Sequence, residues 1–399
     1  MILFGLGVVA TMFVAYNVGG ATTGPAFGPA VGASVISKVT AAALMSVSFF
    51  LGAWTVGRRV VDTLGRDLLT DPTIFTLESS IVVLFFIGGA LLLGNVVGAP
   101  SSTSMTAVGA IAGLGVASGA LNWAVLGEIA SWWIVAPIIG FWVSAVIGRY
   151  LYPRIDRAIA IENTDGALLR LEFSGLLPRV RTGPNTTYRE IAGAGFLVGI
   201  GCLMAFSSGT SNIANAIAPL VGANQLEMNP AIILGCVAVA VGAFTIARRT
   251  METIGNDITD MPLTAAMVVA VVSSTIVIGL SAAGVPASFV VVATMSIVGL
   301  GWGRATRTVT LGEAVQREDS PQLTTGALGA DEAPTVGDPS SPDQETEPAP
   351  MGAESARDLP KTADLFRPAT TARVLGMQNV VPILATAGSF LAFTLLRTL

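Results

Sequence analysis

The sequence contains no histidine and only a small share of charged residues. Charged types make up 12% of its 399 residues, about half of the roughly 25% that is usual in soluble domains. Without histidine, the chain cannot use histidine general bases, histidine metal ligands or histidine proton relays. With so few charged side chains, it cannot cover the surface of a water-soluble protein of this size. The composition therefore predicts an integral membrane protein.

Cysteine is also scarce. Cys202 and Cys236 both lie in apolar tracts and show no paired-ligand spacing, which argues against a disulfide framework and against a zinc site. The N-terminus, MILFGLGVVATMFVAYNVGG, lacks the basic region that opens a cleaved signal peptide. This segment is therefore expected to be a first membrane span.

Long apolar tracts are what the chain has in abundance. Five tracts share only four charged residues; the tracts are residues 1–57, 72–148, 191–247, 261–303 and 374–396. Each is long enough for one or more helical spans of about 20 residues, and none alternates with the period of two that barrel strands show. The predicted fold is an all-α integral membrane protein with roughly 10–12 membrane segments, multi-pass in the cell membrane.

Two polar stretches divide the apolar sequence. Residues 149–190 hold seven arginines and five acidic residues, and the positive-inside tendency favours a cytoplasmic location for them. Residues 311–366 hold 12 of the 26 acidic residues and only three basic ones, a composition typical of a disordered linker. A solvated spacer is favoured there over a regulatory or partner-binding arm. The predicted divisions are a first membrane unit with a following helix (1–148), an arginine-rich connecting loop (149–190), a second membrane unit (191–305), an acidic linker (306–372) and a C-terminal membrane helix (373–399).

The two membrane units are copies of each other. A first constant offset, which places position 15 over position 205, aligns two pairs of segments without gaps: Ala15–Ala33 with Ala205–Ala223, and Phe50–Asp67 with Ala240–Asp257. Seven positions are identical in the first pair and eight in the second. A second, slightly smaller offset aligns Gly98–Ser102 with Gly284–Ser288. Duplicated membrane units are typical of secondary transporters. Inverted repeats with the substrate at the midplane are favoured over parallel ones.

Each unit contains a polar segment between apolar stretches. The segments are Gly19–Pro25 in the first unit and Ser207–Asn215 in the second. Gly19-Gly20 and Gly24-Pro25 are expected to break the first helix, and broken helices at membrane depth are tolerated where they line a cavity or are buried in protein. The N-termini of such half-helices expose backbone N–H groups and a partial positive charge, which suits an anion.

A second polar cluster follows Pro100. It consists of four consecutive hydroxyl residues, Ser101, Ser102, Thr103 and Ser104. Proline fits the first turn of a helix, and hydroxyls there can cap the helix or donate to a ligand. Hydroxyls also hold membrane helices together, so spacing alone does not decide between ligand contact and packing. The matching segment of the second unit, Pro286–Val290, has lost most hydroxyls, and an asymmetric site is therefore expected.

These motifs resemble those of the inorganic phosphate transporter (PiT) family of secondary carriers. One family hallmark reads G-A-N-D-V-A-N-A; here Gly209–Ala216 reads G-T-S-N-I-A-N-A, and Gly19–Ala26 reads G-G-A-T-T-G-P-A. The other hallmark is Pro, a variable residue, then Ser-Thr-Thr-His; here Pro100–Met105 reads P-S-S-T-S-M. The resemblance covers nearly all of residues 1–119 and 191–305. It implies a permease for inorganic phosphate that works by alternating access and is coupled to a cation, usually sodium.

The sequence departs from the family where the family binds its ligands. The motif aspartate falls on Thr22 in the first copy and on Asn212 in the second, and the histidine position is Met105. The chain therefore keeps a polar site but lacks both motif carboxylates. Fewer negative charges repel an anion less and hold sodium less tightly. The sodium dependence or the anion preference is therefore expected to differ from that of a typical member.

The resemblance implies a substrate site without catalytic residues. The candidate substrate-binding residues are Thr22, Thr23, Ser101, Ser102, Thr103, Ser104, Ser211, Asn212 and Asn215. A coupling Na⁺ is expected near Thr22 and Asn212, with H⁺ as the alternative coupling ion, and no other cofactor is expected. The expected partners are inorganic phosphate or a similar oxyanion and the lipid bilayer. A homodimer stays open beside a monomer, and no nucleic acid is expected.

Three other functions fit parts of the sequence. Sulfate matches phosphate in size and oxygen geometry and is the rival substrate. A membrane enzyme acting on lipid-linked phosphate would need a base, a nucleophile or a metal cluster, which the missing histidine and the sparse carboxylates disfavour. A non-transporting sensor derived from a carrier is compatible with the lost aspartates.

Charged residues near the apolar tracts have ordinary explanations. Arg58 and Arg59 are expected to form interfacial ion pairs with nearby acids such as Asp62, in preference to a gating role. Glu78 and Glu128 lie near the starts of apolar segments. We expect both to reach the membrane interface, although an ionisable group within a span can also carry a coupled proton.

Overall fold

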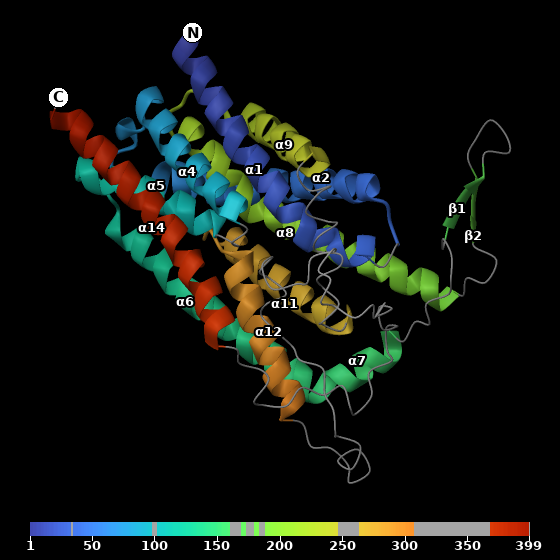
Figure 1. The fold of residues 1–399 in the computed structure, drawn as a ribbon. Helices are drawn as coiled ribbons and strands as arrows, with labels where there is room; N and C mark the ends of the chain where they lie inside the picture. Colours follow the sequence, from blue (N-terminus) through green and yellow to red (C-terminus); the bar gives the residue numbers. More distant parts are fainter. Residues whose placement is uncertain are drawn as a thin grey trace, which may run out of the picture.

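The computed structural model describes residues 1–32, 35–97, 102–159, 169–172, 179–182, 188–245, 263–306 and 368–398. Nearly all of these residues are helical. The helices are α1 (Ile2–Gly32), α2 (Lys38–Thr55), α3 (Gly57–Asp62), η1 (Thr63–Asp67), η2 (Pro72–Ile74), α4 (Leu77–Val97), α5 (Thr103–Ser118), α6 (Trp123–Val146), η3 (Ile147–Leu151), α7 (Tyr152–Ile159), α8 (Tyr188–Gly222), α9 (Met228–Thr245), α11 (Leu263–Ala282), α12 (Phe289–Ala305) and α14 (Pro368–Thr398). Figure 1 shows them as one bundle.

The helices have the length and composition of membrane spans. Within the described residues, eight helices are long and apolar enough to cross a membrane, and two shorter apolar helices correspond to α5 and α12. Large apolar side chains on α6 and α14 point away from the protein, as Ile134 and Leu395 do with exposed fractions of 67% and 63%. Such surfaces suit lipid and not water. The prediction of an all-α, multi-pass membrane protein is confirmed.

The arginine-rich connecting loop contains a short hairpin that the sequence did not indicate. Strands β1 (Leu169–Glu172) and β2 (Arg179–Thr182) pair antiparallel, with Leu169 opposite Thr182. The hairpin extends to one side of the helices (Figure 1). The predicted acidic linker (311–366) and the second copy of the arginine pattern (248–257) lie outside the described residues.

The helix boundaries repeat along the chain with the offsets seen in the sequence. The first offset relates the start of α2 to that of α9 (38 to 228) and the end of α1 to that of α8 (32 to 222). The second offset relates the start of α5 to that of α12 (103 to 289). The same local sequence therefore produces the same helices in both units.

Glycines bring helices of one unit against helices of the other. A Cβ on Gly19 of α1 would collide with the carbonyl of Val239 in α9, and a Cβ on Gly209 of α8 would collide with the carbonyl of Phe49 in α2. The first offset relates Gly19 to Gly209, and it also relates Phe49 to Val239. The two contacts are therefore equivalent. Exchanging the two units turns one contact into the other, as a two-fold axis would.

The first helices of the two units run in opposite directions. Near the start of α1, Gly7 faces Leu220 near the end of α8, and Phe27 near the end of α1 lies against Gly201 in the first half of α8. Figure 1 shows the two helices side by side in this sense. This arrangement is the one that inverted repeats require, while the orientation of the units in a membrane stays a prediction.

The predicted break in the first helix is wrong. α1 is one helix from Ile2 to Gly32 and contains Pro25 and Pro29, and α8 likewise runs unbroken through the polar segment Ser207–Asn215. A proline removes one intrahelical hydrogen bond, whereas unwinding would leave several backbone groups without partners in apolar surroundings. Gly19 serves close helix packing, for which membrane proteins use small residues.

Irregular backbone lies between α11 and α12 instead. Gly284 adopts the left-handed conformation with φ 82°, and the segment Val285–Ser288 that follows is buried. The N–H of Val285 donates to the carbonyl of Leu280 at 2.9 Å. Non-helical backbone at membrane depth is tolerated when it is enclosed by protein in this way.

The C-terminal helix packs on the first unit. α14 lies along α5, whereas α6 lies along α12 of the second unit (Figure 1). Gly113 of α5 and Gly299 of α12 are matching positions of the two units. The first lies against the carbonyl of Thr386 in α14 and the second against that of Phe141 in α6. The helix that follows each unit therefore packs against the other unit.

Candidate functional site

The polar segments of the two units meet at one place. Thr103, in the first turn of α5, donates its hydroxyl to the Asn212 side-chain oxygen of α8 at 2.6 Å. The next residue, Ser104, lies 3.1 Å from Ser211 between hydroxyl oxygens. Both bonds join the first unit to the second. The sequence thus predicted two clusters that the fold brings into a single cluster of hydroxyls and amides.

The peptide of Ala287 forms the third side of this cluster. The hydroxyls of Ser104 and Ser211 both lie within hydrogen-bond distance of the Ala287 carbonyl, at 3.0 and 2.8 Å. The Ala287 N–H donates to the Ser211 hydroxyl oxygen at 3.1 Å. Ser104 is fully buried and Ser211 almost so. The irregular segment between α11 and α12 is therefore fixed by side chains from α5 and α8.

Two asparagines on one face of α8 extend the cluster. Asn212 donates from its amide to the Ser208 hydroxyl at 2.9 Å, and Asn215 donates to the Asn212 side-chain oxygen at 3.2 Å. The side-chain oxygen of Asn215 is buried and has no hydrogen-bond partner within the described part of the chain. A buried oxygen in this condition is a free acceptor for a cation or for water.

Two helices begin at the cluster, and each is capped by serine. The Ser102 hydroxyl accepts from the Met105 N–H at 3.2 Å at the start of α5. The Ser288 hydroxyl accepts from the Val291 N–H at 3.5 Å at the start of α12. The helix N-termini that the sequence placed inside Gly19–Pro25 and Ser207–Asn215 therefore lie here, one segment further along each unit. The partial positive charge at each of these two helix N-termini therefore lies on the side of the cluster.

The remaining predicted residues do not join the cluster. The hydroxyls of Thr22 and Thr23 donate to carbonyls of their own helix, those of Val18 and Gly19, at 2.8 and 2.7 Å. Such bonds within a helix are common for threonine and carry no ligand signal. Ser101 lies outside the described residues. The structure thus joins Thr103, Ser104, Ser211, Asn212 and Asn215, places Ser102 beside them as the cap of α5, and, within the part of the chain it describes, shows no bond from Thr22 or Thr23 to these residues.

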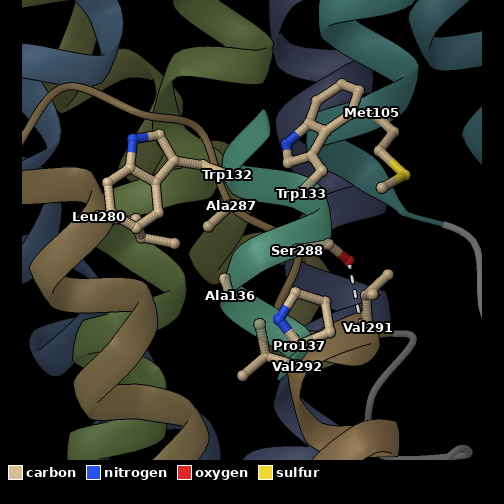
Figure 2. Close-up of a pocket in the computed structure, with 10 residues that line it drawn as sticks. All are labelled: Met105, Trp132, Trp133, Ala136, Pro137, Leu280, Ala287, Ser288, Val291 and Val292. Carbon is tan, nitrogen blue, oxygen red and sulfur yellow. Dashed lines mark hydrogen bonds between the residues drawn. The ribbon is translucent and has the colours of Figure 1, made fainter. Parts of the chain in front are cut away.

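A small apolar pocket adjoins the cluster on the side of α6. It holds about 210 Å³ of empty space, including its open side, and is lined by Met105, Trp132, Trp133, Ala136, Pro137, Leu280, Ala287, Ser288, Val291 and Val292 (Figure 2). The indole N–H of Trp133 donates to the carbonyl of Pro286 at 2.8 Å. Sequence reasoning missed Trp133 and the Ala287 peptide, because neither belongs to a polar motif.

Among the described residues, neither arginine of the pair forms the ion pair predicted with Asp62. Arg58 donates to the Trp54 carbonyl at 2.7 Å and its guanidinium lies 4.4 Å from the centre of the Trp54 ring. Arg59 donates to the carbonyl of Ala282 at the end of α11, where a cation also favours the negative end of the helix dipole. Asp62 pairs instead with Arg66 at 2.9 Å, an exposed i,i+4 pair. Helix geometry places these two side chains on one face.

The two carboxylates near span ends lie on the surface of the bundle, and their place at the membrane interface stays a prediction. Glu78 and Glu128 are both exposed, and neither has a hydrogen bond to the cluster among the described residues. Within those residues, no group of three or more histidine, cysteine, aspartate or glutamate side chains could hold a metal ion. The cluster is therefore neutral and built from oxygen and N–H groups.

Comparison with known proteins gives consistent matches. A model of the phosphate transporter family matches residues 18–318. The sulfate permease CysP of Bacillus subtilis is 30% identical over 298 residues, which cover 74% of this chain and 77% of that protein. A protein of Helicobacter pylori (strain J99), provisionally named a phosphate permease, is 24% identical over 371 residues, covering 73% of this chain and 67% of that protein.

The fold also matches a solved structure. A protein described as a sodium-dependent phosphate transporter superposes with a TM-score of 0.67 at 16% sequence identity, and the match covers 100% of both chains. At this identity the likeness shows the fold. The bundle of Figure 1 therefore has the same fold as that protein.

Proposed function

The chain belongs to the phosphate transporter family, and we propose that it is a secondary permease that carries an inorganic oxyanion by alternating access. The observation that carries this proposal is the cluster in which Thr103 and Ser104 of the first unit meet Asn212 and Ser211 of the second. Repeat transporters bind their substrate between their repeats and open to either side as the repeats rock. Hydroxyls and amides at such an interface can hold an anion while the site closes to one side of the membrane and opens to the other.

The donors of the cluster have to be released before they can bind an anion. The Thr103 hydroxyl points at the Asn212 oxygen, and the Ser211 and Ser104 hydroxyls lie at the Ala287 carbonyl. A hydroxyl hydrogen rotates to suit its partner, so an oxyanion between α5 and α8 can take these donors from the internal acceptors. Binding is then coupled to a change in the contact between the units.

Phosphate is the first substrate we propose, because the chain's family and several relatives carry that name. Sulfate is the second candidate, and a specific observation favours it. Phosphate carries at least one proton near neutral pH and binds best where an acceptor such as a carboxylate takes it, whereas sulfate carries none and needs only donors. The cluster offers hydroxyl and amide donors and has no carboxylate among its described residues. The relative named as a sulfate permease is 30% identical to this chain.

A sodium ion fits the same cluster as coupling ion. Na⁺ takes neutral oxygen ligands, and the unpartnered side-chain oxygen of Asn215 is one. The Asn212 oxygen already accepts from Thr103 and Asn215, so a cation there replaces one of these donors. Since the cluster holds no titratable side chain, a coupled proton would have to travel on the anion itself. Sodium is therefore the coupling ion we propose.

Neither catalysis nor a silent sensor is the favoured function. The family and the matched solved structure are those of transporters. Among the described residues, no general base adjoins the hydroxyls of the cluster, and nucleophilic catalysis requires one. A sensor would bind the anion without carrying it. Flux separates these alternatives.

The experiment is uptake of radiolabelled phosphate and sulfate into proteoliposomes, with and without an inward sodium gradient. We expect saturable uptake that each unlabelled anion reduces in proportion to its affinity. Asn212→Ala and Asn215→Ala should each reduce it at least tenfold. Thr275→Ala is the matched control, because the Thr275 hydroxyl bonds to a carbonyl of its own helix and is exposed. Binding without uptake in the wild-type protein would favour the sensor and reject the permease.

A further inference from the structure

From the contacts around the pocket, we infer that Trp133 is a positioning residue for the anion site. Its indole N–H holds the Pro286 carbonyl, and through this bond α6 fixes the Ala287 peptide against Ser104 and Ser211. The inference rests on the proposed function, because the site it positions is the proposed oxyanion site. Trp133 lies outside both polar motifs.

The backbone of the irregular segment shows why this bond matters. Residues Val285–Ser288 are buried, so each polar backbone group there needs a partner. The Val285 N–H has the Leu280 carbonyl, and the Ala287 N–H has the Ser211 hydroxyl. Proline has no N–H, and the Pro286 carbonyl has the Trp133 indole. Removing the indole N–H leaves a buried carbonyl next to the site without its donor.

Through its hydrogen bond to the Pro286 carbonyl, Trp133 affects groups of both units. Pro286 and Ala287 are adjacent, so a rotation of the peptide that frees the Pro286 carbonyl also turns the Ala287 N–H. Ser211 of α8 meets this N–H, and both Ser211 and Ser104, the latter from α5, meet the carbonyl of the next peptide, that of Ala287. A loose segment therefore misdirects hydroxyls in the second unit and in the first. The bond between α6 and this segment sets the geometry in which the site receives its anion.

Trp132 provides a matched control. It is the next residue on α6 and lines the same pocket (Figure 2). Both tryptophans are partly buried. Trp133→Phe removes the N–H and keeps an aromatic ring at the pocket, whereas Trp132→Phe makes the same chemical change one position away. Differences between the two variants thus report the hydrogen bond to Pro286 and not the loss of indole volume.

Two measurements on the full-length protein test the inference. The first is hydrogen–deuterium exchange of a peptide that spans Gly284–Val291, in which the Ala287 N–H is held by Ser211. The second is the KM and maximal rate of phosphate and sulfate uptake in proteoliposomes. For Trp133→Phe we expect exchange about fivefold faster and KM about fivefold higher, the size of effect that the loss of one neutral hydrogen bond produces. The maximal rate should stay within about twofold, and Trp132→Phe should match the wild type in both measurements.

The outcomes separate this inference from the proposed function. Equal exchange in Trp133→Phe and Trp132→Phe would overturn the inference, whatever the transport result. Faster exchange with an unchanged KM would also overturn it, because the bond would then hold the segment without positioning the site. A wild-type protein that takes up neither anion would reject the proposed function, and the role in positioning an anion site would fall with it. Faster exchange would then show only that Trp133 anchors the segment.

Discussion

Asn212 has more hydrogen bonds within the cluster than its neighbours Thr103 and Asn215. Its side-chain oxygen accepts from Thr103 and Asn215, and its amide donates to Ser208. The family places an aspartate at this position, as the motif comparison indicates. An amide and a carboxylate have nearly the same shape, but the carboxylate accepts at both oxygens and carries a charge. One substitution therefore tests the selectivity argument without a change of volume.

Asn212→Asp should shift the preference of the protein toward phosphate. The new carboxylate accepts the proton of a phosphate and repels fully ionised sulfate. We expect the ratio of kcat/KM for phosphate over sulfate to rise about tenfold, the size of effect expected for a charge-assisted hydrogen bond. Competition uptake with both anions measures the ratio, and Asn212→Ala is the control that removes the amide without adding charge. An unchanged ratio would show that selectivity is set elsewhere.

Ser211→Ala should impair transport more than the loss of one hydroxyl suggests. The Ser211 oxygen meets both the N–H and the carbonyl of Ala287, and a buried group that loses its partner costs about 1–3 kcal/mol. We expect uptake to fall at least tenfold, while Thr275→Ala on α11 leaves it near the wild-type rate. The measurement is the initial rate of uptake at a saturating concentration of the anion. Ser211→Ala with normal uptake would remove Ser211 from the site.

At the scale of helices, close contact between α2 and α8 brings the site together. Gly209 lies two residues before Ser211 and packs against the carbonyl of Phe49. Any side chain at this position pushes the two helices apart. The position of the polar face of α8 therefore depends on a residue that carries no functional group.

Gly209→Ala should destabilise the protein and lower uptake. The added Cβ would collide with the Phe49 carbonyl, and overpacking of this kind typically costs about 1–3 kcal/mol. Gly199→Ala, on the same helix, is the matched control because a Cβ there meets nothing within 4 Å. Thermal unfolding in detergent should show a melting temperature several degrees lower for Gly209→Ala only. Equal melting temperatures would mean that α2 shifts without cost.

The same helices show which features could be predicted from the sequence. The spans and the duplication follow from apolar length and repeated motifs, whereas one site that combines Thr103 and Ser104 with Ser211 and Asn212 was expected from the family resemblance. The predicted break in α1 was wrong. Pro25 signals an interruption in the sequence, but apolar surroundings favour an intact helix. The irregular segment at Ala287 was missed as a binding element because it contributes peptide groups and not side chains. Trp133 was missed because its partner is 153 positions away in the chain.

At the scale of the whole molecule, α6 and α14 each follow one unit in the chain and pack against the other. Phe141 of α6 and Thr386 of α14 place their carbonyls against the matching glycines Gly299 and Gly113, and the internal prolines of the two helices, Pro137 and Pro382, each lie four residues before these contacts. α14 packs on α5 as α6 packs on α12. We propose that α14 is the last helix of the second unit, in place of an appended helix. The acidic linker is then an insertion within that unit.

Each half of the molecule thus supports the site of the other. The side chain of Ser389 on α14 donates to the carbonyl of Ala110 in α5, the helix whose first turn carries Thr103 and Ser104. Trp133 on α6 holds the segment before α12. Rocking of one unit against the other would therefore move both supports together. Such exchange of supports couples the two sides of the bundle.

Inverted units place equivalent residues on opposite sides of the membrane. Ser37 and Glu227 are related by the first offset, are exposed and follow the ends of α1 and α8, which run antiparallel through the bundle. In a background without Cys202 and Cys236, an impermeant maleimide should label Ser37→Cys or Glu227→Cys from outside intact cells, and the other only after permeabilisation. Uptake by both variants is the control for folding. Labelling of both from the same side would show that the two helix ends face the same side of the membrane and would remove the basis for alternating access about a two-fold axis in the membrane plane.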